Sequence, residues 1–185
     1  MHYTASITHN EKTINRLYKT QYYTFGKTRI ILRFVAGLAL IIICAASTLP
    51  LWVKGLLLLI GAWLVSSPDF PAQVMADKVL SSRKNNLPVM NYEFHGDFIK
   101  LSGEGSMNIE YTRFKILIQD SEYYYMFINK DSACMIDKDS ISPHEAENFA
   151  AFIENKTGLA FRREKSLLAM NLQDLRNIFH DFTNH

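Results

Sequence analysis

The amino-acid sequence predicts an α+β protein in which a two-helix transmembrane hairpin is followed by a cytosolic pleckstrin-homology-like β-barrel or sheet domain with a capping helix and an extra C-terminal helix. An apolar stretch over residues 30–65, divided by a single proline, predicts the hairpin. Short strand-like runs that begin at residue 89 and end in a helix-like stretch predict the domain. The expected segments are an N-terminal strand and amphipathic helix (1–29), the transmembrane hairpin (30–66), a connecting helix (67–88), the pleckstrin-homology-like domain (89–161) and a C-terminal amphipathic helix (162–185).

The N-terminal segment combines a short strand, over residues 3–7, with a helix. Thr8 and Glu11 have the spacing of a capping box at the start of this helix. Its apolar residues recur at helical spacing: Ile14, Leu17, Tyr18, Tyr22 and Phe25. Such a stripe fits the surface of an anionic inner leaflet, and it fits equally well against the soluble domain, so both interpretations stay open.

The apolar stretch over residues 30–65 carries only two charges, Arg33 and Lys54. Its first run has about 20 residues, roughly 30 Å of helix, which is enough for the hydrocarbon core of a bilayer. The second run is shorter, with about 15 residues. Because Pro50 interrupts the helical hydrogen-bond ladder between the runs, we expect a short turn and two antiparallel helices.

Positive charges set the expected orientation of the hairpin. They are concentrated before the first run and after the second, whereas the turn carries only Lys54. The positive-inside rule therefore predicts a multi-pass protein with both termini in the cytoplasm. The residues expected at the membrane interface are Arg29, Arg33, Trp52 and Lys54, because long basic side chains and tryptophan favour that boundary.

The apolar stretch also has competing interpretations. A cleaved signal peptide needs a short basic start, but about 29 residues precede this run. A lipoprotein site fails because the bulky Ile43 precedes Cys44. A buried helical hairpin of a soluble protein is an alternative, although the run lacks the polar face of a surface helix. A shallow re-entrant hairpin is another, since the second run is short.

The polar domain begins where the hydrophobic period changes from helical to alternating. Short runs separated by polar segments with glycine indicate successive β-hairpins. In the run over residues 122–128, Tyr123 and Tyr125 point to one side and Tyr124 to the other. Both faces of this strand are therefore largely covered, or one of them binds something.

Three helices are expected around the domain. The connecting helix starts near Asp69 or Pro71, since proline is tolerated in a first turn. Ser142 and Pro143 give the start of the capping helix, and Gly158 lies just beyond its end. The last helix has an apolar stripe that either docks on the domain or forms an oligomerisation seam. Its members are Leu168, Leu172, Leu175, Phe179 and Phe182.

Three stretches carry a resemblance to a known family: IEYTRFKI at 109–116, QDSEYYYMF at 119–127 and ACMIDK at 133–138. Together with the preceding strand, helix and apolar hairpin, they resemble the YcxB-like family of bacterial membrane proteins over roughly residues 1–161. The chain departs from the family pattern in having Asp137 where proline is usual and Tyr111 where tryptophan is common. The resemblance implies a bacterial inner-membrane protein with a cytosolic pleckstrin-homology-like domain, and it transfers no catalytic residues.

The sequence contains no motif that predicts catalysis. It has no P-loop, dinucleotide-binding fingerprint or nucleophile elbow. No acidic residue lies within the apolar runs, which argues against a proton-coupled transporter or an intramembrane protease. Cys44 and Cys134 lie far apart, and a net charge of +2 gives no footprint for nucleic acid. We therefore predict no catalytic residues, no cofactor and no metal site.

These features predict a membrane-anchored, non-enzymatic interaction or regulatory protein of the bacterial inner membrane, such as an immunity-type or accessory factor. Its expected partners are membrane lipid and either a protein partner or a second copy of the chain, with no nucleic acid. A lipid-headgroup-sensing module and an unrecognised membrane enzyme are the alternatives. The candidate interaction residues are Tyr111, Tyr123, Tyr125, Leu168, Leu172, Leu175 and Phe179.

Overall fold

The structure is a computed structural model that describes residues 2–83, 87–103, 105–143 and 146–163. Its helices are α1 (Glu11–Phe25), α2 (Lys27–Ala46), α3 (Leu51–Ser66), α4 (Phe70–Ser82) and α5 (Ala146–Thr157), with 3-10 turns η1 (Tyr111–Arg113) and η2 (Lys138–Ser140). Its strands are β1 (Tyr3–Thr8), β2 (Val89–Phe94), β3 (Phe98–Ser102), β4 (Ser106–Glu110), β5 (Ile116–Gln119), β6 (Tyr123–Asn129), β7 (Ser132–Asp137) and β8 (Phe161–Arg163). The predicted α+β class is confirmed.

The strands form two four-stranded sheets, in the orders β1-β2-β3-β4 and β7-β6-β5-β8. Among the described strands, only β5 and β8 pair in parallel. The predicted pleckstrin-homology-like barrel is not supported, because the described strands form no closed barrel. The segment after β7 occupies the outer edge of β1 instead: the backbones of Thr4 and Ser142 exchange hydrogen bonds of 2.9 and 2.8 Å. β7 therefore lies beside β1 without joining it in a ladder.

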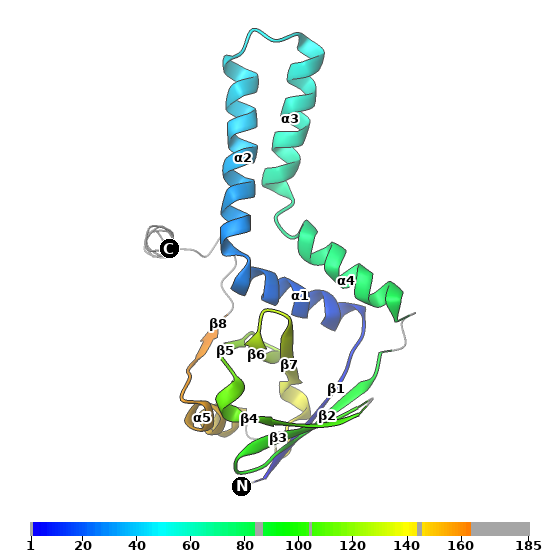
Figure 1. Cartoon of the computed structure of the whole chain (residues 1–185), viewed down its shortest axis with the longest axis vertical. Helices are drawn as coiled ribbons and strands as arrows, with labels where there is room; N and C mark the ends of the chain where they lie inside the picture. The colour runs from blue at the N-terminus through cyan, green and yellow to red at the C-terminus, as the bar shows by residue number, and fades with distance from the viewer. Residues whose placement is uncertain (1, 84–86, 104, 144–145, 164–185) are drawn as a thin grey trace.

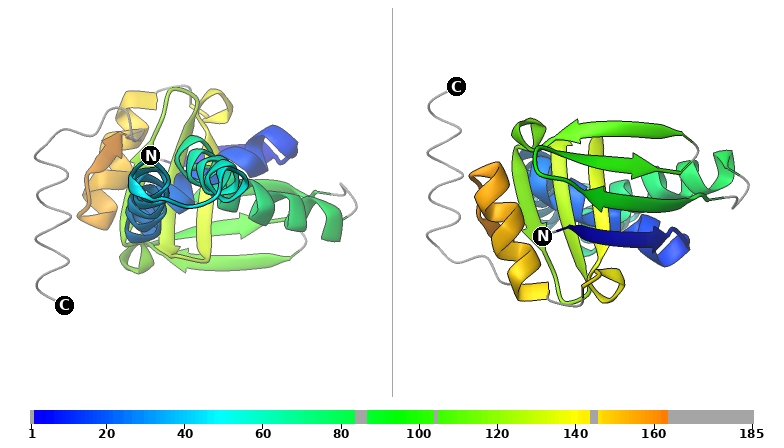
Figure 2. Two further views of the ribbon diagram at one scale, coloured as in Figure 1. Left: turned by 90° about the horizontal axis from the view of Figure 1, so that it is seen from above. Right: turned by 90° about the horizontal axis from the view of Figure 1, so that it is seen from below.

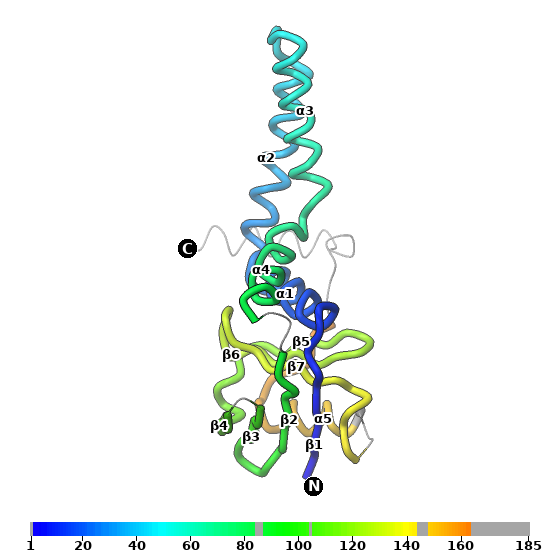
Figure 3. Tube along the Cα trace, turned by 90° about the vertical axis from the view of Figure 1, so that its right-hand side faces the viewer, coloured from blue at the N-terminus to red at the C-terminus, as the bar shows by residue number. Residues whose placement is uncertain are grey.

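The first strand of the chain pairs with β2, in a register that sets Tyr3 opposite Phe94. Helices α1 to α4 all lie between these two strands in the sequence, so the apolar hairpin is an insertion within the first sheet. Figure 1 shows α2 and α3 as a long hairpin at one end of the molecule, with α1 and α4 between it and the sheets. The same order is visible from the side in Figure 3. We call α1 and α4 together the collar.

The two sheets and α5 share one apolar core. Phe149 of α5 is fully buried, and its ring centroid lies 4.9 Å from that of Phe94 and 5.4 Å from that of Tyr3, both in the first sheet. The ring of Tyr124, in the second sheet, is 5.5 Å away. Figure 2 shows α5 lying alongside the sheets. This helix therefore packs the two sheets together.

One helix in the described part of the chain, α2, is long and apolar enough to cross a membrane by itself. The shorter α3 meets the same criterion only when it is taken with α4, and the two are bent by 71°. By length and composition the described residues thus contain one helix able to span a bilayer, or two spans if the bent pair acts as one.

Candidate functional site

The hairpin of α2 and α3 exposes apolar side chains over much of its surface. Only 11% of an 18-residue window of α2 is buried. Leu32 and Ile42 on α2, and Leu51 and Leu59 on α3, are between 64% and 86% exposed. A helix in the core of a soluble protein has its apolar surface covered, whereas the described residues leave most of this hairpin uncovered. Large contiguous apolar surfaces mark sites of contact with protein or membrane.

Two glycines bring α2 and α3 into close contact. A methyl group added at Gly37 would lie 2.9 Å from the carbonyl oxygen of Gly61, and one added at Gly61 would lie 2.9 Å from the carbonyl oxygen of Gly37. Small residues let helix backbones approach in this way in membrane proteins. By contrast, a methyl group at Gly55 would meet nothing within 4 Å. The backbones of α2 and α3 are therefore in close contact at Gly37 and Gly61, which we call the reciprocal glycine contact.

The four predicted membrane-interface residues lie at the two ends of the hairpin. Arg29, which is exposed, and Arg33 lie in the part of α2 nearest the collar. The guanidinium of Arg33 donates a 3.3 Å hydrogen bond to the carbonyl oxygen of Ser67 and lies 5.5 Å from the ring centroid of Trp63. Trp52 and Lys54 lie at the far end, in the first turn of α3, and Trp52 is 76% exposed. Their role at a membrane interface stays a prediction.

The collar packs tightly and connects the hairpin to the domain. Ile14 of α1 is buried against Ala76 and Leu80 of α4. Nearer the hairpin, Tyr22 of α1 is buried with Ile30 of α2 and Ala72 of α4. α1 thus contacts α4 through apolar side chains, and its other contacts reach the second sheet. The predicted N-terminal helix therefore has part of its apolar stripe covered by protein.

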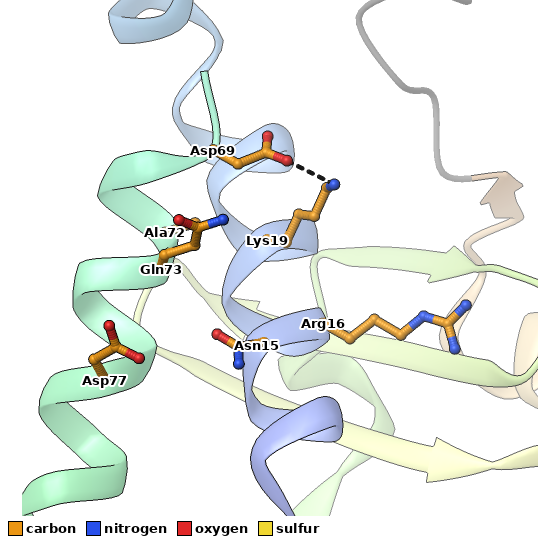
Figure 4. A pocket seen from close by; sticks show the side chains of 7 residues that line it. All are labelled: Asn15, Arg16, Lys19, Asp69, Ala72, Gln73 and Asp77. Carbon is orange, nitrogen blue, oxygen red and sulfur yellow. Dashed lines mark ion pairs between the residues drawn. The ribbon is translucent and has the colours of Figure 1, made fainter. Parts of the chain in front are cut away.

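A polar groove lies between the two collar helices (Figure 4). It has a volume of about 320 Å³ and is lined by Asn15, Arg16, Lys19, Asp69, Ala72, Gln73 and Asp77. Lys19 Nζ lies 2.6 Å from Asp69 Oδ2, and the hydroxyl of Tyr23 also donates to Asp69. Figure 4 shows Arg16 pointing away from α4. The groove is therefore a polar surface in which Lys19 and Asp69 are already paired with each other, and Arg16 is paired outside it.

Arg16 fixes α1 to the turn between β5 and β6. Its Nε lies 3.2 Å from Asp120 Oδ2, and its Nη1 lies 2.7 Å from Glu122 Oε2. Asp120 also accepts hydrogen bonds from the backbone N–H of Tyr123 and the hydroxyl of Tyr125, both at 2.7 Å. The hydrogen bond between Arg16 and Glu122 lowers the pKa of Glu122 and raises that of Arg16. Charge-assisted hydrogen bonds are the stronger ones, so this cluster orients the collar on the domain.

The predicted interaction tyrosines Tyr111, Tyr123 and Tyr125 are buried in the domain core. The guanidinium of Arg16 lies 5.3 Å from the ring centroid of Tyr123, and the opposite face of β6 presents Tyr124 to α5. The tyrosine-rich strand is thus covered by a helix on each face, and in this structure these three side chains are not accessible to a partner. The other predicted interaction residues, Leu168, Leu172, Leu175 and Phe179, and the predicted C-terminal helix that carries them, lie outside the described residues.

Sequence reasoning missed the residues that fix these elements to one another. Gly37 and Gly61 were visible as glycines within apolar runs, which is a signal of helix contact. Asp120 precedes a turn, but nothing local indicates its partner on α1. Lys138 donates a 2.6 Å hydrogen bond to the carbonyl oxygen of Asp120 and lies 4.5 Å from the ring centroid of Tyr124. The lysine in the ACMIDK stretch therefore joins the end of β7 to the β5–β6 turn.

One group of described side chains has the composition of a metal site. The ligand atoms of His2, Glu93 and His95 all lie within 4.8 Å of one another, because the β1–β2 register brings the two histidines side by side. Two imidazoles and a carboxylate are ligands that suit Zn²⁺. However, Glu93 already lies 3.4 Å from Lys100 Nζ, and all three side chains are exposed or half-exposed. The group has the character of a surface ion-pair cluster.

The geometry thus defines a class of protein: an α+β domain of two sheets with an apolar helical hairpin inserted between its first two strands. Residues 94–153 match the model of a family described as YcxB-like protein. This segment runs from the end of β2 into α5, so the match covers most of the two-sheet core and excludes the hairpin. The resemblance noted in the sequence is supported for these residues. No curated protein and no solved structure matches the chain.

Proposed function

We propose that this chain is a membrane-anchored, non-enzymatic interaction or regulatory protein, whose hairpin lies in a bilayer and holds the two-sheet domain at its surface. The proposal rests on the apolar surface of the hairpin, which the other described residues leave uncovered. The 20 residues of α2 correspond to about 30 Å of helix, the thickness of a hydrocarbon core. Lipid is the solvent in which such a surface is stable, and a helix satisfies its own backbone hydrogen bonds there.

The membrane we propose is the bacterial inner membrane, with the domain on the cytoplasmic side. Arg29 and Arg33 at the domain end of the hairpin support this orientation through the positive-inside rule. Both hairpin helices also connect to the same collar, as two crossings in opposite directions require. The bacterial origin and the membrane in this proposal are what the family resemblance of the sequence implies, and the family match over residues 94–153 does not include the hairpin.

Labelling of the hairpin tip distinguishes two crossings from a shallow re-entrant hairpin. In a Cys44→Ala background, Trp52→Cys places a thiol at the exposed tip. We expect a membrane-impermeant maleimide to label this thiol from outside intact spheroplasts. Cys134 does not compete, because its burial raises the pKa of the thiol to about 12 and keeps it protonated.

A matched control for this labelling is Asp131→Cys, in the exposed turn between β6 and β7. It should react only when the reagent reaches the cytoplasmic side. A re-entrant hairpin would leave Trp52→Cys, like this control, unlabelled from outside. Recovery of the full chain in the soluble fraction, without detergent, would contradict the anchor itself.

The role of the domain in this proposal is to bind a protein partner or a second copy of the chain. Anchoring raises the effective concentration of a module for other membrane components to about millimolar, so a weak contact is sufficient. We expect affinity capture of the full chain from mild detergent to enrich one defined membrane protein or additional copies of the bait. An unrelated membrane protein with the same tag is the control, and identical captures from both baits would count against the binding role.

A further inference from the structure

Helix α4 has two different faces. Ala72, Ala76 and Leu80, spaced four residues apart, are buried on the side that packs against α1. Two exposed apolar side chains on the other side, Val74 and Met75, are 48% and 47% accessible. A surface helix of a soluble domain normally has polar residues opposite its buried stripe. The first two turns of α4 therefore expose apolar side chains on the side away from α1, and the exposed Asp77, Lys78 and Ser81 follow further along the helix.

The exposed apolar surface of the hairpin continues onto α4. The ring of Phe70, the first residue of α4, lies 5.2 Å from that of Trp63 near the end of α3, in an edge-to-face contact. The 71° bend between α3 and α4 then turns α4 away from the hairpin axis. Figure 1 shows α4 running obliquely outward from the base of the hairpin, with α1 next to it and the sheets beyond them. A bilayer that holds the hairpin would therefore have its surface beside the first turns of α4.

The start of α4 is held in this direction by the collar. Asp69, directly before the helix, pairs with Lys19 of α1 and accepts a hydrogen bond from Tyr23. On the next turn, Ala72 is buried against α1 and α2. The bend is thus maintained by contacts with α1, and it is not a free joint between two helices.

We propose that the outer face of α4 lies in the headgroup region of the bilayer as an interfacial helix, so that the collar rests on the lipid surface. Phe70, Val74 and Met75 insert at the boundary between headgroups and acyl chains, and the exposed Lys78 on the same side attracts anionic headgroups. This inference rests on the proposed membrane anchor. Lipid is favoured over a protein partner because the apolar face is continuous with the hairpin surface and begins where the hairpin ends.

A polarity-sensitive fluorophore on single cysteines tests the inference in the full chain. The Cys44→Ala background carries Val74→Cys, Gln73→Cys or Leu59→Cys and is reconstituted into vesicles of phosphatidylethanolamine and phosphatidylglycerol. Val74 and Gln73 are adjacent and both exposed, but Gln73 lines the polar groove. We expect a blue-shifted emission at Val74 and several-fold stronger quenching there than at Gln73 by lipids that carry a headgroup spin label.

Leu59, exposed in the middle of α3, separates failure of this inference from failure of the anchor. Deep-chain spin labels should quench its fluorophore if the hairpin is in the bilayer. Quenching at Leu59 with equal, water-like signals at Val74 and Gln73 would overturn the interfacial role of α4 alone. A blue shift at Val74 without lipid quenching would mean that protein, such as a second copy, covers this face, and would also overturn it. Absence of quenching at Leu59 would overturn both proposals.

Discussion

Replacing Phe149 with alanine is expected to lower the free energy of unfolding of the two-sheet domain by about 3–5 kcal/mol, the usual cost of deleting a buried aromatic ring. The ring is fully buried and contacts Tyr3 and Phe94 of one sheet and Tyr124 of the other. Its loss leaves a cavity between the sheets that rigid strands on both sides cannot collapse to fill. Denaturant unfolding of the full chain in mild detergent, followed by near-ultraviolet circular dichroism of the tyrosines, measures the change.

Met107→Ala is the control for this substitution. Met107 is a large apolar residue on β4 that is 50% exposed, so its truncation should change stability by less than about 0.5 kcal/mol. Equal losses for the two variants would mean that α5 does not pack the two sheets together as described. A large loss for Phe149→Ala alone would confirm that a single core supports the whole domain.

Local sequence patterns predict the elements whose signals are contained in a few residues. Period-two alternation identified the strand that became β6 (Tyr123–Asn129), and Pro50 separates the two apolar helices at the predicted place. Serine and proline ahead of the last described helix, with Gly158 beyond its end, indicated that α5 exists, but its described part begins at Ala146, and Ser142 pairs with Thr4 of β1 instead. At Gly158 the backbone has a φ of 68°, a conformation that favours glycine and ends the helix.

Pairing between distant segments is not encoded in such patterns. Four helices separate Tyr3–Thr8 from β2 in the sequence, and nothing within these residues indicates that β2 is their partner strand. The predicted barrel failed for the same reason. Its closure depends on the outer edge of β1, and there the backbone of Ser142 takes the hydrogen bonds that a neighbouring strand would need. Only tertiary contacts decide between a closed barrel and two sheets.

The residues of the candidate site also fall into those that local patterns predict and those that depend on distant contacts. Composition was sufficient to place Arg33 and Trp52 near opposite ends of the apolar hairpin. The alternation in β6 showed that both of its faces carry aromatic rings, but it did not show what covers them. Tyr123 and Tyr125 are buried because α1 docks over them through Arg16, a contact between residues more than 100 positions apart. Whether these tyrosines are exposed or buried could be predicted only with knowledge of that contact.

Replacing Gly61 with leucine is expected to separate α2 from α3 and to destabilise the hairpin by about 3 kcal/mol, the upper end of the usual cost of overpacking. The added Cβ would lie 2.9 Å from the carbonyl oxygen of Gly37 and 2.9 Å from Ile41 Cγ1. A flexible side chain can swing aside, but a helix carbonyl cannot move without shifting the whole of α2. The rest of the leucine side chain therefore has no space while the helices stay in contact.

Hydrogen–deuterium exchange of the full chain in detergent micelles measures this effect segment by segment. Amides of α2 and α3 should exchange faster in Gly61→Leu, whereas peptides from β6 and β7 should be unchanged, because the buried contacts at the base of the hairpin are with the collar. Gly55→Leu is the matched control on the same helix, since a Cβ there meets nothing within 4 Å. If both variants exchange alike, the reciprocal glycine contact does not hold the hairpin closed. Faster exchange in Gly61→Leu alone would mean that close packing of the two backbones keeps α2 and α3 together. In lipid, where the hydrophobic effect does not drive helices to associate, such packing is a main source of helix association.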